Sequence, residues 1–145
     1  LNVKDLNEVN MVQMNLEYLG NLKVKAQHGP SQAIIHTAAP IDNNGDGSSF
    51  SPTDLLCTSL ASCILTILGI RSKDLGWKLE GLKVLLEKRM TTEPRRIGCI
   101  AMTFQVPKGF PKDQQASLQQ MVFECPVCHS ISDQIELDYE FIFEE

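Results

Sequence analysis

The sequence predicts an α+β fold organised around one long central helix. Residues 55–70 form an uncharged run bounded by helix start and stop signals, and segments with alternating apolar residues lie on both sides of it. The expected order of elements is βββ-α-ββ-α-α-β, with the long helix buried in the middle of the fold.

The central helix has recognisable ends. Ser51 suits the cap position, Pro52 the first helical position, and Asp54 a first turn whose free N–H groups favour a carboxylate. Gly76 follows as a stop signal. The helix is apolar on nearly every side, so we expect other elements to bury it on several sides. We judge it too short and too polar to span a bilayer.

Six strands are expected from apolar residues that recur at every second position. They are residues 12–18, 22–26, 33–37, 82–90, 100–106 and 135–143. The first three form an antiparallel meander, and the fourth and fifth form a hairpin. Between the last two strands, apolar residues from Leu118 to Cys125 recur at helical spacing, and Pro126 suits the start of a new short helix.

Length and composition bound the class of protein. We expect residues 12–145 to form a single domain and residues 1–11 to be an extension or vector-derived residues. The net charge is −5, and no Lys/Arg cluster is present, which argues against a nucleic-acid partner. No signal peptide is recognisable, and the five cysteines are an odd number, so we expect a reducing cytoplasmic location.

The string CPVCH at residues 125–129 has three chemical interpretations. A haem attachment site requires export, and a thioredoxin fold requires far more chain after the motif than is present. A zinc site is awkward because Cys128 and His129 are adjacent and point to different faces of a helix. The local redox chemistry of a Cys-X-X-Cys pair stays open.

The thiols themselves can be reactive or merely buried. If Pro126 begins a helix, unsatisfied N–H groups stabilise a thiolate at Cys125, and Cys128 shares that helix end. Free cysteines are otherwise usually small buried hydrophobic residues, and we expect that of Cys57 and Cys99. For Cys63, the residues alone favour the same interpretation.

A calcium loop is not expected. Asp42, Asn44, Asp46 and Gly47 match the first half of an EF-hand, but Thr53 stands where the bidentate Glu is required. We therefore expect neither a metal ion nor a cofactor.

Two cysteine-containing segments resemble a known family. Residues 51–63, SPTDLLCTSLASC, resemble the cysteine helix of the OsmC/Ohr family, and residues 125–127, CPV, resemble its second-cysteine motif. The YLG string at residues 18–20 and the EPRRIG string at residues 93–98 agree with the resemblance. It extends over roughly residues 12–143.

This resemblance implies an intertwined homodimer and an enzyme, a thiol peroxidase of the stress response that reduces organic hydroperoxides. Cys63 would be the peroxidatic thiolate and become a sulfenic acid, and Cys125 would condense with it to a disulfide. A lipoyl-type dithiol would reduce that disulfide. No nucleic acid or membrane partner is implied.

The chain departs from the family's peroxidases around the first cysteine. They place a Glu ten residues before it, where this chain has Thr53 with Asp54 beside it. They also supply an Arg from the N-terminal half, whereas this chain has no Arg before Arg71. Arg95, Arg96 or a residue of the other subunit would have to replace that cation, and Cys128 adds a third thiol. The alternative function is a non-enzymatic thiol redox or small-apolar-ligand binding module on the same fold.

Overall fold

The computed structural model describes residues 11–144, and the expected extension at residues 1–11 lies almost wholly outside that range. The chain divides into two compact units, Leu1–Pro52 and Thr53–Glu145, each considered by itself. The α+β class is confirmed, and the order of the strands and of the long helix is as expected. That residues 12–145 form a single domain stays a prediction.

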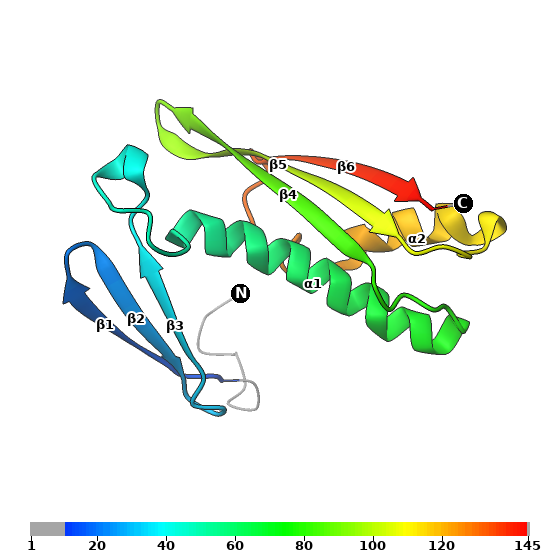
Figure 1. Cartoon of the computed structure of the whole chain (residues 1–145), viewed down its shortest axis with the longest axis horizontal. Helices are drawn as coiled ribbons and strands as arrows, with labels where there is room; N and C mark the ends of the chain where they lie inside the picture. Colours follow the sequence, from blue (N-terminus) through cyan, green and yellow to red (C-terminus); the bar gives the residue numbers. More distant parts are fainter. Residues whose placement is uncertain (1–10, 145) are drawn as a thin grey trace, which may run out of the picture. The chain divides into compact units, whose positions relative to one another are not determined.

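The first unit contains the predicted meander. Strands β1 (Met14–Gly20), β2 (Lys23–His28) and β3 (Ile34–Ala38) pair antiparallel in that order. Each begins within two residues of the predicted position. A short 3-10 helix, η3 (Ile41–Asn43), follows in the polar loop (Figure 1).

One face of the β1–β2–β3 sheet is apolar and exposed. Met14, Leu16 and Tyr18 alternate along β1 and are 59%, 69% and 65% exposed. The register places Leu16 opposite Ala26 and Ala26 opposite Ile35, which extends this face across all three strands. Apolar surface of this extent is unusual on a monomeric soluble protein.

Helix α1 (Pro52–Leu75) begins at the predicted proline and ends just before Gly76, whose φ of 70° favours glycine. Its buried residues follow helical spacing along one side; they are Cys57, Leu60, Ala61, Ile64 and Leu68. Leu56, Ile70 and Leu75 are exposed. The expectation of burial on several sides is therefore not met among residues 11–144, which bury only one side of α1.

The sequence-based judgement on membrane spanning also changes. By length and composition alone, α1 is long and apolar enough to cross a membrane. One such helix is weak evidence, because the core helix of a soluble protein meets the same criteria. The packing of α1 against a sheet, described next, favours the core helix.

The second unit places α1 against a mixed sheet. Strands β4 (Lys83–Thr92), β5 (Arg95–Val106) and β6 (Glu136–Phe143) lie in that order, with β4 antiparallel and β6 parallel to the central β5. The β4–β5 hairpin is the predicted one. Alternate residues of β5, among them Ile100 and Phe104, join the buried side of α1 in one hydrophobic core. Figure 1 shows α1 lying along this sheet.

The segment between β5 and β6 differs from the prediction at its end. It contains η4 (Lys112–Gln114), α2 (Gln115–Met121) and η5 (Val122–Glu124), so one α-helix is present where two were expected. Residues 126–130 form turns rather than the predicted short helix. The His129 N–H donates to the Cys125 carbonyl at 3.3 Å. So short a segment closes too few such bonds to offset the cost of helix nucleation.

Candidate thiol site

The second unit brings Cys63 of α1 together with Cys125, which directly follows η5. A side-chain hydrogen bond with Cys63 is among the causes that raise the pKa of Cys125, so the two thiols are neighbours. The Cys125 Sγ also lies 4.0 Å from the carbonyl oxygen of Leu60, one turn before Cys63 on the helix. Residues 62 positions apart in the sequence thus form a thiol pair. That they are catalytic stays a prediction.

The thiols of this site differ in exposure. All five cysteines are free; Cys125 is fully buried, whereas Cys63 and Cys128 are partly exposed. A solvent-borne reagent therefore reaches Cys63 and Cys128 more readily than Cys125. Of the two cysteines expected to be structural, Cys57 is fully buried and Cys99 only half-buried.

Burial controls the acidity of Cys125. It raises the pKa of that thiol to about 11, and the hydrogen bond with Cys63 acts in the same direction. The N–H groups of Val127 and Cys128 lower the pKa, but by less. The expectation of a stabilised thiolate at Cys125 is therefore wrong. The expected N–H donors are present, but desolvation outweighs them, and the pKa rises instead of falling.

Tyr139 of β6 lies beside Cys128, the third cysteine of the site. Its hydroxyl oxygen is buried and interacts with the Cys128 thiol, which is a weak hydrogen-bond partner and leaves the hydroxyl poorly satisfied. Burial, and then the nearby Cys128, raise the pKa of Tyr139. The sequence analysis used Tyr139 only as an apolar strand residue, although its place in the alternation indicated that it faces inward.

An ion pair links the segment that carries Cys125 to α1. Arg71 near the end of α1 donates to one carboxylate oxygen of Glu124, from Nη2 at 2.7 Å and from Nε at 3.1 Å. Since Glu124 directly precedes Cys125, this contact lies next to the second cysteine. The sequence analysis did not identify either residue as part of a site.

Thr53 and Asp54 gather around a lysine that the sequence analysis missed. The Lys88 Nζ donates to the Asp54 Oδ1 at 2.6 Å and to the Thr53 Oγ1 at 2.8 Å, and its side chain is only 17% exposed. The sequence pattern indicates a role for Lys88, because this lysine stands at an inward position in the alternation of β4.

This cluster lies nearer to Cys57 than to Cys63. Thr53 precedes Cys63 by ten residues, about 15 Å along a helix. Lys88 and Asp54 instead influence the buried Cys57: burial raises the pKa of that thiol, Lys88 lowers it and Asp54 raises it. The structure therefore does not bring the predicted supporting residues Thr53 and Asp54 to Cys63.

The two arginines proposed as substitute cations lie at the start of β5. The Arg96 Nη1 donates to the carbonyl oxygens of Ile97 at 3.0 Å and Gln134 at 3.1 Å. Arg95 pairs in the sheet with Thr92. A role for either arginine at Cys63 stays a prediction.

The possible metal sites gain no support. Asp46 of the calcium-like loop forms an ion pair with Lys23 at 2.9 Å, and its carboxylate accepts the Ser48 N–H at 3.0 Å. Between residues 11 and 144, no three His, Cys, Asp or Glu side chains are arranged to hold a metal ion. The carboxylate of this loop thus serves the local structure of its own unit.

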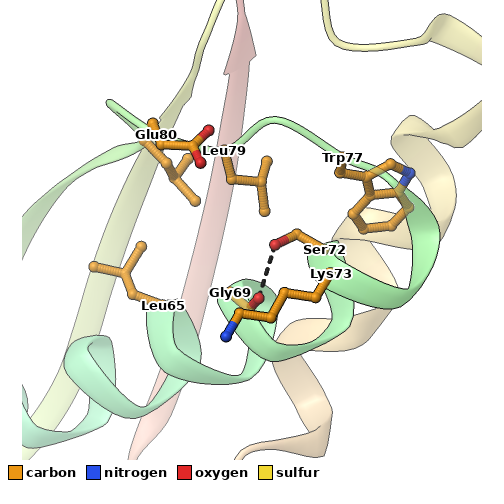
Figure 2. A pocket seen from close by; sticks show the side chains of 8 residues that line it. Leu65, Gly69, Ser72, Lys73, Trp77, Leu79 and Glu80 are labelled. Atoms are coloured by element: carbon orange, nitrogen blue, oxygen red, sulfur yellow. Dashed lines mark hydrogen bonds between the residues drawn. The ribbon is translucent and has the colours of Figure 1, made fainter.

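A pocket of about 410 Å³ lies beside the C-terminal half of α1 (Figure 2). Helix residues form one wall and the following segment the other; the lining consists of Leu65, Gly69, Ser72, Lys73, Trp77, Leu79, Glu80 and Leu82. The Ser72 hydroxyl donates to the Gly69 carbonyl at 2.7 Å, so it is already paired. None of the cysteines lines this pocket.

The chain matches the family model described as OsmC-like protein over residues 45–140. Among solved structures, it is similar to a Psychrobacter arcticus protein described as an osmotic stress induced and detoxification response protein. The two share 35% identity with a TM-score of 0.87, over 94% of this chain and 100% of that one. No curated protein matches the chain significantly by sequence.

Two more distant structures share the fold. The Legionella pneumophila organic hydroperoxide resistance protein OsmC is 14% identical, with a TM-score of 0.74 over 92% of this chain and 97% of that one. An organic hydroperoxide resistance protein from Elizabethkingia anophelis, with thiocyanate bound, is 12% identical, with a TM-score of 0.74 over 96% of this chain and 100% of that one. At 14% and 12% identity, the similarity to these two proteins shows a shared fold and nothing about function.

The raised pKa of Cys125 predicts a loss of stability at alkaline pH. A thiol whose pKa is about 11 in the folded protein and about 9 otherwise stabilises the fold below pH 9, and this contribution disappears as the pH rises to 11. The free energy of unfolding should fall over this range, on the order of 2 kcal/mol more in the wild type than in Cys125→Ala. Denaturant unfolding at several pH values measures it. Because Cys57 and Tyr139 also titrate late, Cys125→Ala retains part of the fall, and parallel curves for the two proteins would contradict the prediction.

Proposed function

Because this chain belongs to the OsmC-like protein family, we propose that it is a thiol peroxidase that reduces organic hydroperoxides, with Cys63 and Cys125 as its redox pair. The observation that carries the proposal is the approach of these two thiols across the core of one unit. The same reaction requires reduced cysteines between cycles, which favours the cytoplasm, and it suits a role in the response to oxidative stress.

The first step uses the more accessible thiol. Cys63 loses its proton, and the thiolate attacks the terminal oxygen of the hydroperoxide. An S–O bond forms, the O–O bond breaks, and the alkoxide leaves and takes up a proton to become the alcohol. Cys63 is thereby oxidised to a sulfenic acid. Its partial exposure admits the substrate, and its place on an apolar helix favours an organic peroxide over hydrogen peroxide.

The second step uses the buried partner. Cys125 attacks the sulfenic sulfur, an S–S bond forms, and water leaves. The high pKa of Cys125 keeps this thiol protonated until the sulfenic acid appears next to it, which limits its own reaction with peroxide. A dithiol of the lipoyl type then reduces the disulfide in two exchange steps.

The test is oxidation of the reduced protein by one equivalent of cumene hydroperoxide, followed by mass spectrometry of alkylated peptides. We expect a Cys63–Cys125 disulfide in the wild type and a sulfenic acid on Cys63 in Cys125→Ser. Peroxidase activity of Cys63→Ser should fall by roughly 10³-fold or more, as expected when a nucleophile is removed.

The matched control is Cys57→Ser, which alters a fully buried thiol of the same helix. It should retain the activity of the wild type if it folds, which circular dichroism establishes. An unmodified Cys63 in wild-type protein after exposure to peroxide would reject the proposed function.

The proposal includes a homodimer. The apolar face of the β1–β2–β3 sheet is exposed, with Leu16 midway along its edge strand β1 and Tyr18 nearby, and so are Leu56 and Ile70 on α1. A second copy of the chain is the partner that supplies complementary apolar surface at equal concentration. Burial of these side chains would stabilise the dimer by about 25 cal/mol per Å² of apolar surface removed from water.

Leu16→Glu should convert this dimer to a monomer, because it places a charge on the apolar face. Light scattering coupled to size-exclusion chromatography measures the mass. The control is Asn15→Asp, which adds the same charge on the other face of β1. A wild-type protein that elutes at the mass of one chain, 16.2 kDa, would refute the dimer.

The pocket favours a second candidate function, binding of a small apolar ligand without chemistry. Its lining combines leucines and Trp77 with two charged residues, Lys73 from the helix and Glu80 from the following segment (Figure 2). Such a mixture is typical of sites that bury an apolar molecule and orient one polar end of it. The thiols take no part in this pocket, so the two candidate functions can be separated by experiment.

Trp77 is the chain's single tryptophan and lines the pocket, so its fluorescence reports on ligands. If the pocket binds apolar ligands, titration with decanoate should change this fluorescence in a saturable way. Gly69→Leu should abolish the change by filling the pocket, while Gly69→Ala, whose added Cβ meets nothing within 4 Å, serves as the mild control. No saturable change, together with peroxide turnover, would leave the peroxidase as the function.

A further inference from the structure

The third thiol of the site has no role in a two-cysteine cycle. Cys125 and Cys128 lie in one turn, closed by the hydrogen bond from the His129 N–H to the Cys125 carbonyl. Residues three positions apart in such a turn have Cα atoms within about 7 Å, which is the range that a disulfide requires. Cys125 can therefore pair with either of two sulfurs, Cys63 or Cys128.

The two possible disulfides differ in what they leave free. Each contains the buried Cys125 and one partly exposed cysteine, so a reductant can reach either of them at one sulfur. A Cys63–Cys125 disulfide blocks the thiol that reacts with peroxide, whereas a Cys125–Cys128 disulfide leaves Cys63 as a thiol.

We propose that Cys128 is a third redox thiol, which takes over the disulfide from Cys63 and so returns Cys63 to the thiol form before the reductant acts. This inference rests on the proposed peroxidase function and assigns a further catalytic residue to it. The geometry that carries it is the contact of the Cys125 Sγ with the Leu60 carbonyl, one turn before Cys63, and the single turn that holds Cys125 and Cys128.

The exchange is balanced without a further oxidant. The Cys128 thiolate attacks the Cys125 sulfur, the Cys125–Cys128 bond forms, the Cys63–Cys125 bond breaks, and Cys63 leaves as a thiolate. The proton of Cys128 passes to solvent, which this partly exposed residue contacts. A dithiol then reduces the Cys125–Cys128 disulfide and becomes a cyclic disulfide itself. Cys63 is ready for peroxide before that reduction occurs.

Tyr139 is placed to assist this exchange. Its buried hydroxyl interacts with Cys128 and lacks a strong partner. A thiolate accepts a hydrogen bond more strongly than a thiol does, so the hydroxyl would stabilise Cys128 in its attacking form. The ring is held in place by an edge-to-face contact with Phe123 at 5.3 Å between centroids. Tyr139 is thus a positioning residue for the exchange.

The experiment counts peroxide equivalents without any reductant. Reduced wild-type protein should consume two equivalents of cumene hydroperoxide, because the exchange returns Cys63 to the thiol form after the first. Cys128→Ser should consume one and stop at the Cys63–Cys125 disulfide. Peptide mapping at successive times should show that disulfide giving way to Cys125–Cys128 in the wild type. The control Cys99→Ser, a half-buried cysteine of β5, should behave like the wild type.

Steady-state turnover with dihydrolipoamide provides a second readout. Cys128→Ser and Cys128→Ala should lose roughly tenfold or more in the reductive step while the rate of the first oxidation stays unchanged. Tyr139→Phe, which keeps the ring, should slow the exchange and shift its pH profile to higher pH. Melting temperatures of all variants establish that they are folded, so that a loss confined to the reductive step is not a folding defect.

The outcomes separate the two proposals. One equivalent consumed by the wild type, with a lasting Cys63–Cys125 disulfide and normal turnover of Cys128→Ser, would overturn the role of Cys128 and leave the peroxidase standing. A Cys63 that peroxide does not oxidise would overturn both. Consumption of two equivalents of cumene hydroperoxide by the wild type and of one by folded Cys128→Ser would support the exchange.

Discussion

The packing of one side of α1 against the β4–β5–β6 sheet is the constraint on which the site depends. This contact buries Leu60, Ile64 and Leu68 with the inward residues of β5, and it fixes the helix on which Cys63 lies. The chain that returns from β5 to β6 crosses the same core, in which Leu118, Val122 and Cys125 are buried. The Arg71–Glu124 ion pair adds little, because both side chains are about half exposed. The approach of Cys125 to Cys63 therefore follows from burial in one core rather than from any local motif.

The same burial decides which thiol can act first. At Cys125 two N–H groups favour the thiolate, yet the loss of hydration opposes it more strongly and raises the pKa. Such a thiol is a poor first nucleophile and a suitable second one, because a sulfenic acid placed next to it needs no free diffusion to react. In the proposed reaction, the division of labour between an accessible and a buried cysteine would thus follow from their depth in the core.

Much of this arrangement could be predicted from sequence, because local patterns control it. The helix start at Pro52, the stop at Gly76 and the alternation of the strands set most element boundaries within a few residues. What could not be predicted depends on contacts between distant residues: the pairing of β6 parallel to β5, the ion pair of Arg71 with Glu124, and the sign of the pKa shift at Cys125. Lys88 is the exception, since a lysine at an inward strand position was visible and was overlooked.

A cation that activates Cys63 must lie close to its sulfur. The described contacts of Arg71 and Arg96 go to Glu124 and to backbone carbonyls, and Lys88 is held by Asp54 near the start of α1. A residue that stabilises a thiolate must lie within about 4–6 Å of it. In the proposed homodimer, a residue of the second copy would meet this distance at the side of α1 where Leu56 and Ile70 are exposed. Activation of the first thiol and burial of these side chains would then depend on the same association.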